Sequence, residues 1–354
     1  MKKRILGAIL ACAMTIGLLA GCGGGSSSGS SGGSGGSSSS GGVSTSGGGE
    51  SSGGLTASAI SSSWKVTCPW APSGVAAMVS QMAATKSPDH SDSITLVAEA
   101  IAGDAATVNT WVLDTEANDP ELVFVGEGLL SITSIIDPSK MQFGEEDLAF
   151  VENLYSSIFV LSADADLNIN TLDELEAYVA EGNPVSVAVN GATGSEAFLA
   201  AALFGSMEAS DLKLVPYQSA AEAAQAVARG ETQFAVSHQS QIQENFQQGT
   251  VTVVCAFDEK AIENGPFAGV EGVGEQGYPY FRNRCFIMAR AGTDEAAIAE
   301  LRELYDSILA DEEMVTWLQD TMLLEADPMT QEEVDAHLEN VRSIVTEYQD
   351  VVVG

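Results

Sequence analysis

Residues 183–238 constrain the fold more than any other part of the chain, because short strand patterns alternate there with helical ones. The predicted strands are apolar, β-branched runs bounded by turn residues, and the predicted helices show an apolar stripe or a Ser-x-x-Glu capping box. In chain order, we expect strands at 185–189, 212–217 and 234–237, with helices at 195–207 and 219–229 between them. This order is typical of a parallel sheet in an α/β fold, whose strand-end loops carry ligands.

The loop between the first strand and helix of this segment is a candidate binding site. It reads Asn190-Gly191-Ala192-Thr193-Gly194-Ser195 and has no bulky side chain, so its backbone N–H groups can approach a ligand closely. A helix that begins at Ser195 presents unpaired N–H groups, which favour an anion. We therefore take Asn190, Gly191, Thr193, Gly194 and Ser195 as ligand-binding candidates.

Three peptides of this segment resemble one known family. They are Gly-Ala-Thr-Gly-Ser at 191–195, Leu-Val-Pro-Tyr-Gln-Ser-Ala at 214–220 and Gly-Glu-Thr-Gln-Phe at 230–234. In order and spacing they are similar to the extracytoplasmic solute-binding receptors of tripartite tricarboxylate transporters, also called Bug-type receptors. The resemblance implies a two-lobed, type 2 periplasmic-binding-protein-like α/β fold. Each lobe would be a mostly parallel sheet flanked by helices, with the ligand cleft between the lobes.

The resemblance also implies what the protein does. We expect a solute-binding protein and no enzyme, with no cofactor and no catalytic residues, that captures a small carboxylate with the loops preceding its helices. Its partners would be the large and small membrane subunits of the transporter. A sensing lipoprotein that signals to a membrane kinase is the alternative, and genomic neighbours would discriminate the two.

Further binding candidates come from matching the family's loops to this chain. A predicted first strand ends at Trp70, and its loop matches the family's ligand-wrapping loop at Pro72, Ser73 and Gly74, although Ala77 stands where the family has an acidic residue. The loops after the next two strands contribute Gly103 and Gly126. Ser237 and His238 occupy a polar position of the family after a strand, and Arg284 replaces a position that is aromatic in the family. Arg284 would supply the cation that a carboxylate needs.

The first residues predict export and lipid attachment. Lys2-Lys3-Arg4 precede an apolar run, and Leu19-Ala20-Gly21-Cys22 resembles a lipobox, in which Cys22 receives lipid. Residues 23–61 are rich in Gly and Ser and are expected to form a flexible tether. We expect residues 1–22 to be the signal peptide, 62–156 and 282–354 to build one lobe and 157–281 to build the other. The protein would be extracytoplasmic and anchored to the cell membrane by its lipid.

Composition excludes several other classes of protein. The formal net charge is −35, and the leader carries three of the basic residues, so the processed chain has a charge of −38. Nucleic acid is therefore not an expected partner, because phosphate contacts need a basic face. No Cys-x-x-Cys or paired His spacing predicts a metal site. Cys68, Cys255 and Cys285 are interpreted as buried thiols, with a Cys255–Cys285 disulfide left open.

Two motifs indicate chemistry that the rest of the chain does not support. Gly272-Val-Gly-Glu-Gln-Gly277 fits a dinucleotide pattern, but no apolar strand feeds it and Pro279 blocks the helix it would need. A hydrolase that uses Ser73 or Ser195 lacks a general base. His90 and His337 are expected to face solvent, as is Glu127.

The lipobox yields a direct prediction. Replacing Cys22 with Ala should abolish incorporation of labelled palmitate and release the protein from the cell surface, because the thiol that accepts lipid is gone. Metabolic labelling and cell fractionation measure both effects. A Cys22→Ala protein that still incorporates palmitate and stays cell-bound would contradict the assignment.

Overall fold

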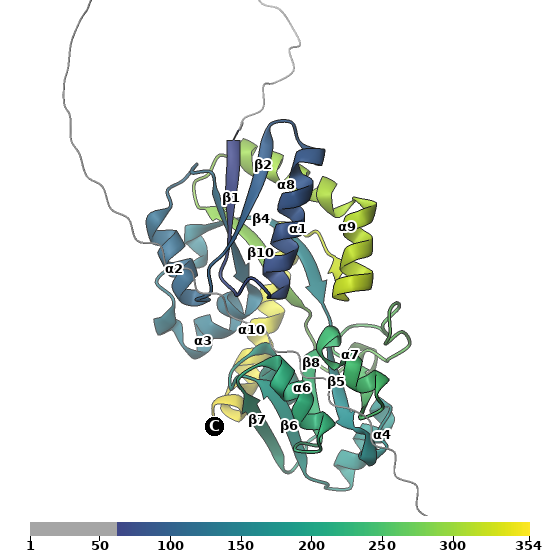
Figure 1. Ribbon diagram of the computed structural model, residues 1–354. Helices are drawn as coiled ribbons and strands as arrows, with labels where there is room; N and C mark the ends of the chain where they lie inside the picture. Colours follow the sequence, from purple (N-terminus) through teal and green to yellow (C-terminus); the bar gives the residue numbers. More distant parts are fainter. Residues whose placement is uncertain (1–61) are drawn as a thin grey trace, which may run out of the picture. The chain divides into compact units, whose positions relative to one another are not determined.

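The computed structural model describes residues 62–354. The predicted signal peptide, Cys22 and the predicted tether lie outside the described residues. Two β-sheets flanked by helices organise this part of the chain (Figure 1). Among the described residues, no helix is both long and apolar enough to cross a membrane.

The first sheet has six strands in the order β11-β4-β10-β3-β1-β2. Its strands are β1 (Ser62–Cys68), β2 (Ile94–Ala100), β3 (Glu121–Gly126), β4 (Leu148–Ser157), β10 (Asn283–Arg290) and β11 (Glu325–Ala326). β1 pairs in parallel with β2 and β3, while β10 pairs antiparallel with β3 and β4. Helices α1 (Val75–His90) and α8 (Glu295–Leu309) contact each other beside this sheet.

The second sheet has five strands in the order β7-β6-β8-β5-β9. They are β5 (Phe159–Asp164), β6 (Val185–Asn190), β7 (Leu212–Tyr217), β8 (Phe234–His238) and β9 (Val251–Ala256). β6 is parallel to β7 and β8, as the 183–238 pattern predicts, whereas β5 is antiparallel to β8 and β9. Both sheets are thus mixed, because the strands that enter from the other sheet run against their neighbours.

The chain passes from the first sheet to the second with one residue, Ile158, between β4 and β5. This passage lies beside the predicted boundary between residues 156 and 157. The return brings β10 into the first sheet at Asn283. The division into lobes at residues 156 and 281 stays a prediction.

The remaining α-helices of residues 62–354 include the two predicted at 195–207 and 219–229, which correspond to α5 and α6. They are α2 (Ala105–Asp114), α3 (Ser134–Ile136), α4 (Leu172–Ala180), α5 (Ser195–Ser206), α6 (Ala220–Ala228), α7 (Gln239–Gln247), α9 (Glu312–Thr316) and α10 (Gln331–Val353). Thr171, Ser219 and Thr330 each accept a hydrogen bond from the backbone N–H three residues on, as in the capping boxes. π-Helical turns occupy Leu129–Thr133 and Trp317–Met322.

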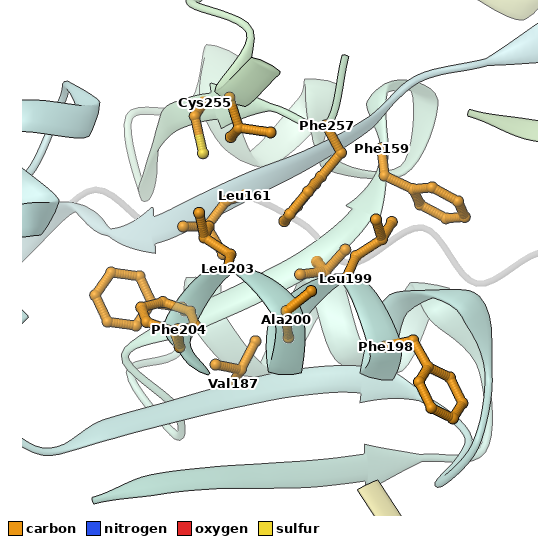
Figure 2. Packing of buried hydrophobic residues seen from close by; sticks show 14 of the residues in the cluster. Phe159, Leu161, Val187, Phe198, Leu199, Ala200, Leu203, Phe204, Cys255 and Phe257 are labelled. Carbon is orange, nitrogen blue, oxygen red and sulfur yellow. The ribbon is translucent and has the colours of Figure 1, made fainter. Parts of the chain in front are cut away.

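Helix α5 is buried on all sides. Figure 2 shows Leu199 and Leu203 directed toward Leu161 and Phe257 of the second sheet's core. The opposite side of α5 is covered by the last turns of α10, through Val341, Ile344 and Val345. The first turns of α10 instead pack in a cluster with α2 and β10, so this one helix belongs to two hydrophobic cores.

The packing of α5 predicts a large loss of stability on truncation. Leu203 is fully buried, so Leu203→Ala should lower the free energy of unfolding by about 2–5 kcal/mol through lost burial and a residual cavity. Denaturant titration measures the change. Leu113→Ala is the matched control, because Leu113 lies on α2 with 69% of its surface exposed and should change stability little. Equal losses in the two variants would contradict this description of the core.

Candidate functional site

The candidate residues cluster where strands of both sheets end. Gly126 ends β3, and a Cβ added there would lie 3.2 Å from the Trp70 ring, so the loops after β1 and β3 are in contact. A Cβ on Gly128 would lie 3.8 Å from Ser195 Oγ at the start of α5. The loop after β3 therefore meets the loop after β6, which brings candidates of the first and second sheets together.

Helix α1 begins without a side-chain cap. Its N-cap Gly74 has extended backbone, and the Gly74 N–H donates to the Ala71 carbonyl at 2.8 Å. No acidic residue stands in the first turn, and Ala77 is buried. Because the first N–H groups of any helix lack intrahelical acceptors, this end of α1 can bind an anion beside Ser73.

The β6–α5 loop is held by its backbone. Gly191 has a φ of +73°, which favours glycine, and its N–H donates to the Tyr217 carbonyl at 3.0 Å. Gly194 is the N-cap of α5, and a Cβ there would lie 2.8 Å from the Asn190 carbonyl oxygen. The two glycines are thus required by the shape of the loop itself.

Glu196, which the sequence interpretation overlooked, lies at this loop. It is the second residue of α5 and only 5% exposed. The pKa of its carboxyl is raised to about 7, chiefly by burial; hydrogen bonding to its own N–H and to Asn190 opposes the rise, and the charge of the nearby Glu127 adds to it. In the sequence, Glu196 could have been identified as unusual because it is the one charged residue in an otherwise largely apolar predicted helix.

The expectation that Glu127 and His337 face solvent is wrong. Glu127 is fully buried and His337 is 8% exposed, because α10 covers the loop after β3. His337 Nε2 lies 2.7 Å from Glu127 Oε2, which also accepts the Arg284 backbone N–H at 3.1 Å. The pair forms because α10 packs against the loop after β3. A local sequence pattern cannot indicate a contact between residues 210 positions apart.

The Arg284 side chain is engaged within the protein. Its Nε donates to Asp327 at 2.7 Å, and its Nη1 lies 2.8 Å from His337 Nδ1. Arg284 also lines a cavity of about 950 Å³ with Tyr278, Tyr280 and Arg282, and the lining includes none of the candidate glycines. A direct role for Arg284 with a ligand stays a prediction.

Ser237 and His238 end β8. The His238 ring stacks on Phe159 at 4.3 Å between centroids, and its Nδ1 lies 2.8 Å from Ser157 Oγ. His238 also lines a small cavity with Val75, the first residue of α1, so the end of β8 approaches the uncapped helix start. Ser237 Oγ is buried without a hydrogen-bond partner in the described residues.

Other candidates lie at the edge of this cluster. The Gly103 N–H donates to the Pro69 carbonyl at 3.1 Å, which ties the loop after β2 to the loop after β1. Pro72 lines a separate pocket of about 350 Å³ with Met78 and Trp317. Thr193 is exposed beside Gly194.

The cysteines and the glycine motif have structural roles. Cys68, Cys255 and Cys285 are buried free thiols, and Cys255 and Cys285 belong to different sheets, so no disulfide joins them. Val273–Gln276 forms one 3₁₀ turn that ends at Gly277 with a φ of +83°. Within residues 62–354, no group of three His, Cys, Asp or Glu side chains is arranged to hold a metal ion.

His238 predicts a dependence of stability on pH. Burial lowers its pKa from 6.5 to about 4, so as the pH falls the unfolded chain takes up a proton first. The contribution of His238 to stability is complete above pH 6.5 and is lost as the pH falls toward 4. His238→Gln should therefore lose less stability than the native protein between pH 6.5 and 4 in thermal unfolding. Parallel pH curves would contradict the prediction.

Comparison with known proteins identifies the family. The sequence profile of the tripartite tricarboxylate transporter family receptor matches residues 94–341, whereas no curated protein matches. A TctC solute-binding protein from Polaromonas, solved without ligand, has 14% identity and a TM-score of 0.69 over 80% of this chain and 98% of its own.

Two ligand-bound structures share the fold. An R. palustris protein with adipate has 14% identity and a TM-score of 0.67, over 82% of this chain and 97% of its own. MatC from Rhodopseudomonas palustris, with bound malate, has 18% identity and a TM-score of 0.61, over 82% of this chain and 98% of its own. The profile match spans most of the chain, which therefore belongs to the receptor family of the tripartite tricarboxylate transporters.

Proposed function

We propose that this receptor captures a small carboxylate outside the cytoplasm and delivers it to the large and small membrane subunits of a tripartite transporter. Family membership establishes a solute-binding receptor. The malate and adipate held by two proteins of the same fold support a carboxylate ligand. Lipid on Cys22 would hold the protein at the membrane, and the Gly- and Ser-rich residues 23–61 would set its reach.

The observation that carries the proposal is the uncapped start of α1 beside the glycine loops. Gly74 caps α1 with backbone only, and no acidic side chain occupies the first turn. An anion at this place would be held by charge-assisted backbone hydrogen bonds, which need no cation nearby. This mode of binding suits a chain whose formal net charge is −35.

The ligand would be enclosed where the loops of the two sheets meet. Gly126 and Gly128 follow β3, and Ser195 starts α5, so exclusion of water there would strengthen each polar contact. We assign Trp70, Ser73 and the loop 190–195 to contacts with the ligand, and Ser237 to a supporting hydrogen bond. Ile158, between β4 and β5, and the return before Asn283 would form the hinge.

Bulk at Gly128 tests the position of the site. An added Cβ meets Ser195 and Ile132 at ordinary contact distances of 3.8 and 3.9 Å, so the backbone at Gly128 accepts a Cβ without a clash, and thermal unfolding checks that the variant folds. We expect Gly128→Val to weaken carboxylate binding about tenfold to a hundredfold, as loss of one charge-assisted hydrogen bond would. Calorimetry of the purified protein with mono-, di- and tricarboxylates measures this.

The control places a valine elsewhere. Ala310→Val lies at the exposed end of α8 and should leave affinity unchanged. Gly194 is a poorer position, because a Cβ there would clash with the Asn190 carbonyl and distort the loop. Unchanged affinity in Gly128→Val would move the site elsewhere. Absence of binding by every carboxylate in the native protein would refute the ligand class.

A further inference from the structure

The edge of the first sheet carries a groove that the proposed ligand site does not use. β2 is the last strand of this sheet and pairs only with β1. Helix α1 packs against β2, and Figure 1 shows α9 on the other side of α1. Residues of β2 and α1 line a pocket of about 350 Å³, and residues of α1 and α9 line another of about 710 Å³. Met82 and Trp317 line both pockets, which therefore form one groove, called here the α1 groove.

The backbone of β2 is open along the α1 groove. The Ile101 N–H donates to a carbonyl of β1 at 2.9 Å, whereas the Leu96 N–H donates away from β1, to Ser87 Oγ of α1, at 2.9 Å. Because successive N–H groups of a strand point to opposite sides, those of Ala98 and Ala100 also point away from β1. No hydrogen bond within residues 62–354 engages these two N–H groups. They are available to pair with another strand.

The pocket beside these two residues suits an apolar side chain. Ala98, Ala100 and Ala77 contribute only small side chains to its lining, which leaves space between β2 and α1. Met78, which is 36% exposed, and Trp317 also line it, and thioether and indole groups pack well against aliphatic and aromatic groups. A partner's apolar side chain that enters this pocket would therefore be removed from water.

The second pocket of the groove is acidic. Asp311, Glu312, Glu313 and Asp320 line it, with Lys86 as the one basic residue of the lining. Lys86 Nζ is already engaged, because it lies 3.1 Å from Asp311 and 2.5 Å from Glu313. Glu312 and Asp320 are exposed and form no ion pair among the described residues. Two negative charges are thus left for basic groups of a partner.

We propose that the α1 groove docks an extended segment of a partner protein. The segment pairs with the edge of β2, places an apolar side chain in the first pocket and directs a lysine or arginine to Glu312 and Asp320. Anionic lipid does not fit this surface, because the chain has a formal net charge of −35 and these two acids are exposed. The inference rests on the proposed function, which makes the partner a membrane subunit of the transporter.

Charge reversal tests the acidic pocket. The purified receptor, prepared without lipid, is titrated against nanodiscs that hold the large and small membrane subunits, with empty nanodiscs as the reference. The double variant Glu312→Lys, Asp320→Lys should bind about tenfold more weakly or worse, because attraction becomes repulsion. Glu339→Lys with Glu347→Lys is the matched control. These glutamates are also exposed and eight residues apart, and they lie on α10, so their reversal should leave affinity unchanged.

Two further variants test the apolar pocket and the strand edge. Met78→Asp places a charge in the pocket, whereas Leu113→Asp replaces another exposed apolar residue, on α2. Ala98→Pro removes an outward N–H, which an edge strand tolerates, whereas Ala98→Ser keeps the N–H. We expect Met78→Asp and Ala98→Pro to weaken binding about tenfold and both controls to bind as the native receptor does. Thermal unfolding and carboxylate calorimetry check that each variant is folded.

The outcomes separate this inference from the proposed function. Folded variants that all bind the loaded nanodiscs as tightly as the native receptor would overturn the docking surface, while delivery to the membrane subunits would stand. Unchanged binding by Ala98→Pro alone would overturn the pairing with β2. If the native receptor binds loaded nanodiscs no better than empty ones, both the docking surface and the delivery are rejected. Capture of a carboxylate is decided separately, by calorimetry of the receptor alone.

Discussion

The packing of α10 against two hydrophobic cores is the constraint on which the rest of the structure depends. Val334 and Leu338 in its first half join the cluster of α2 and β10, and Val341 and Val345 in its second half cover α5. Helix α5 is apolar on every side and has no surface that water could solvate at low cost. Separating the two cores would expose both halves of this contact, which limits how far the sheets can move apart.

This packing also determines the geometry of the binding loops. Burial of α5 fixes the position of Ser195 and of the loop before it, and α10 places His337 over Glu127. Helix α10 thereby contacts the loop after β3, and the same loop also meets the start of α5. In the proposed site, backbone groups on rigid elements would contact the ligand, and such groups lose little freedom when a ligand binds.

The two helix starts at these loops differ in charge. Most of the basic side chains form ion pairs elsewhere, such as Arg282 with Asp258 and Arg302 with Glu152. The two helix starts then differ in one respect: α5 begins with a buried glutamate and α1 has none.

The sequence by itself determined the local elements and the family. Capping boxes at Thr171, Ser219 and Thr330, and the strand patterns around the 190–195 loop, depend on neighbours a few residues apart, so they can be read along the chain. Tertiary structure alone decided the contacts between distant segments. The contact of Glu127 with His337, separated by 210 residues, follows from the packing of α10 against the loop after β3, and the engagement of Arg284 by Asp327 follows from the pairing of β11 with β4, the neighbour of β10. Glu127 and His337 were expected to face solvent because they are polar residues in polar local sequence, whereas burial depends on what packs above a residue and not on its neighbours in sequence.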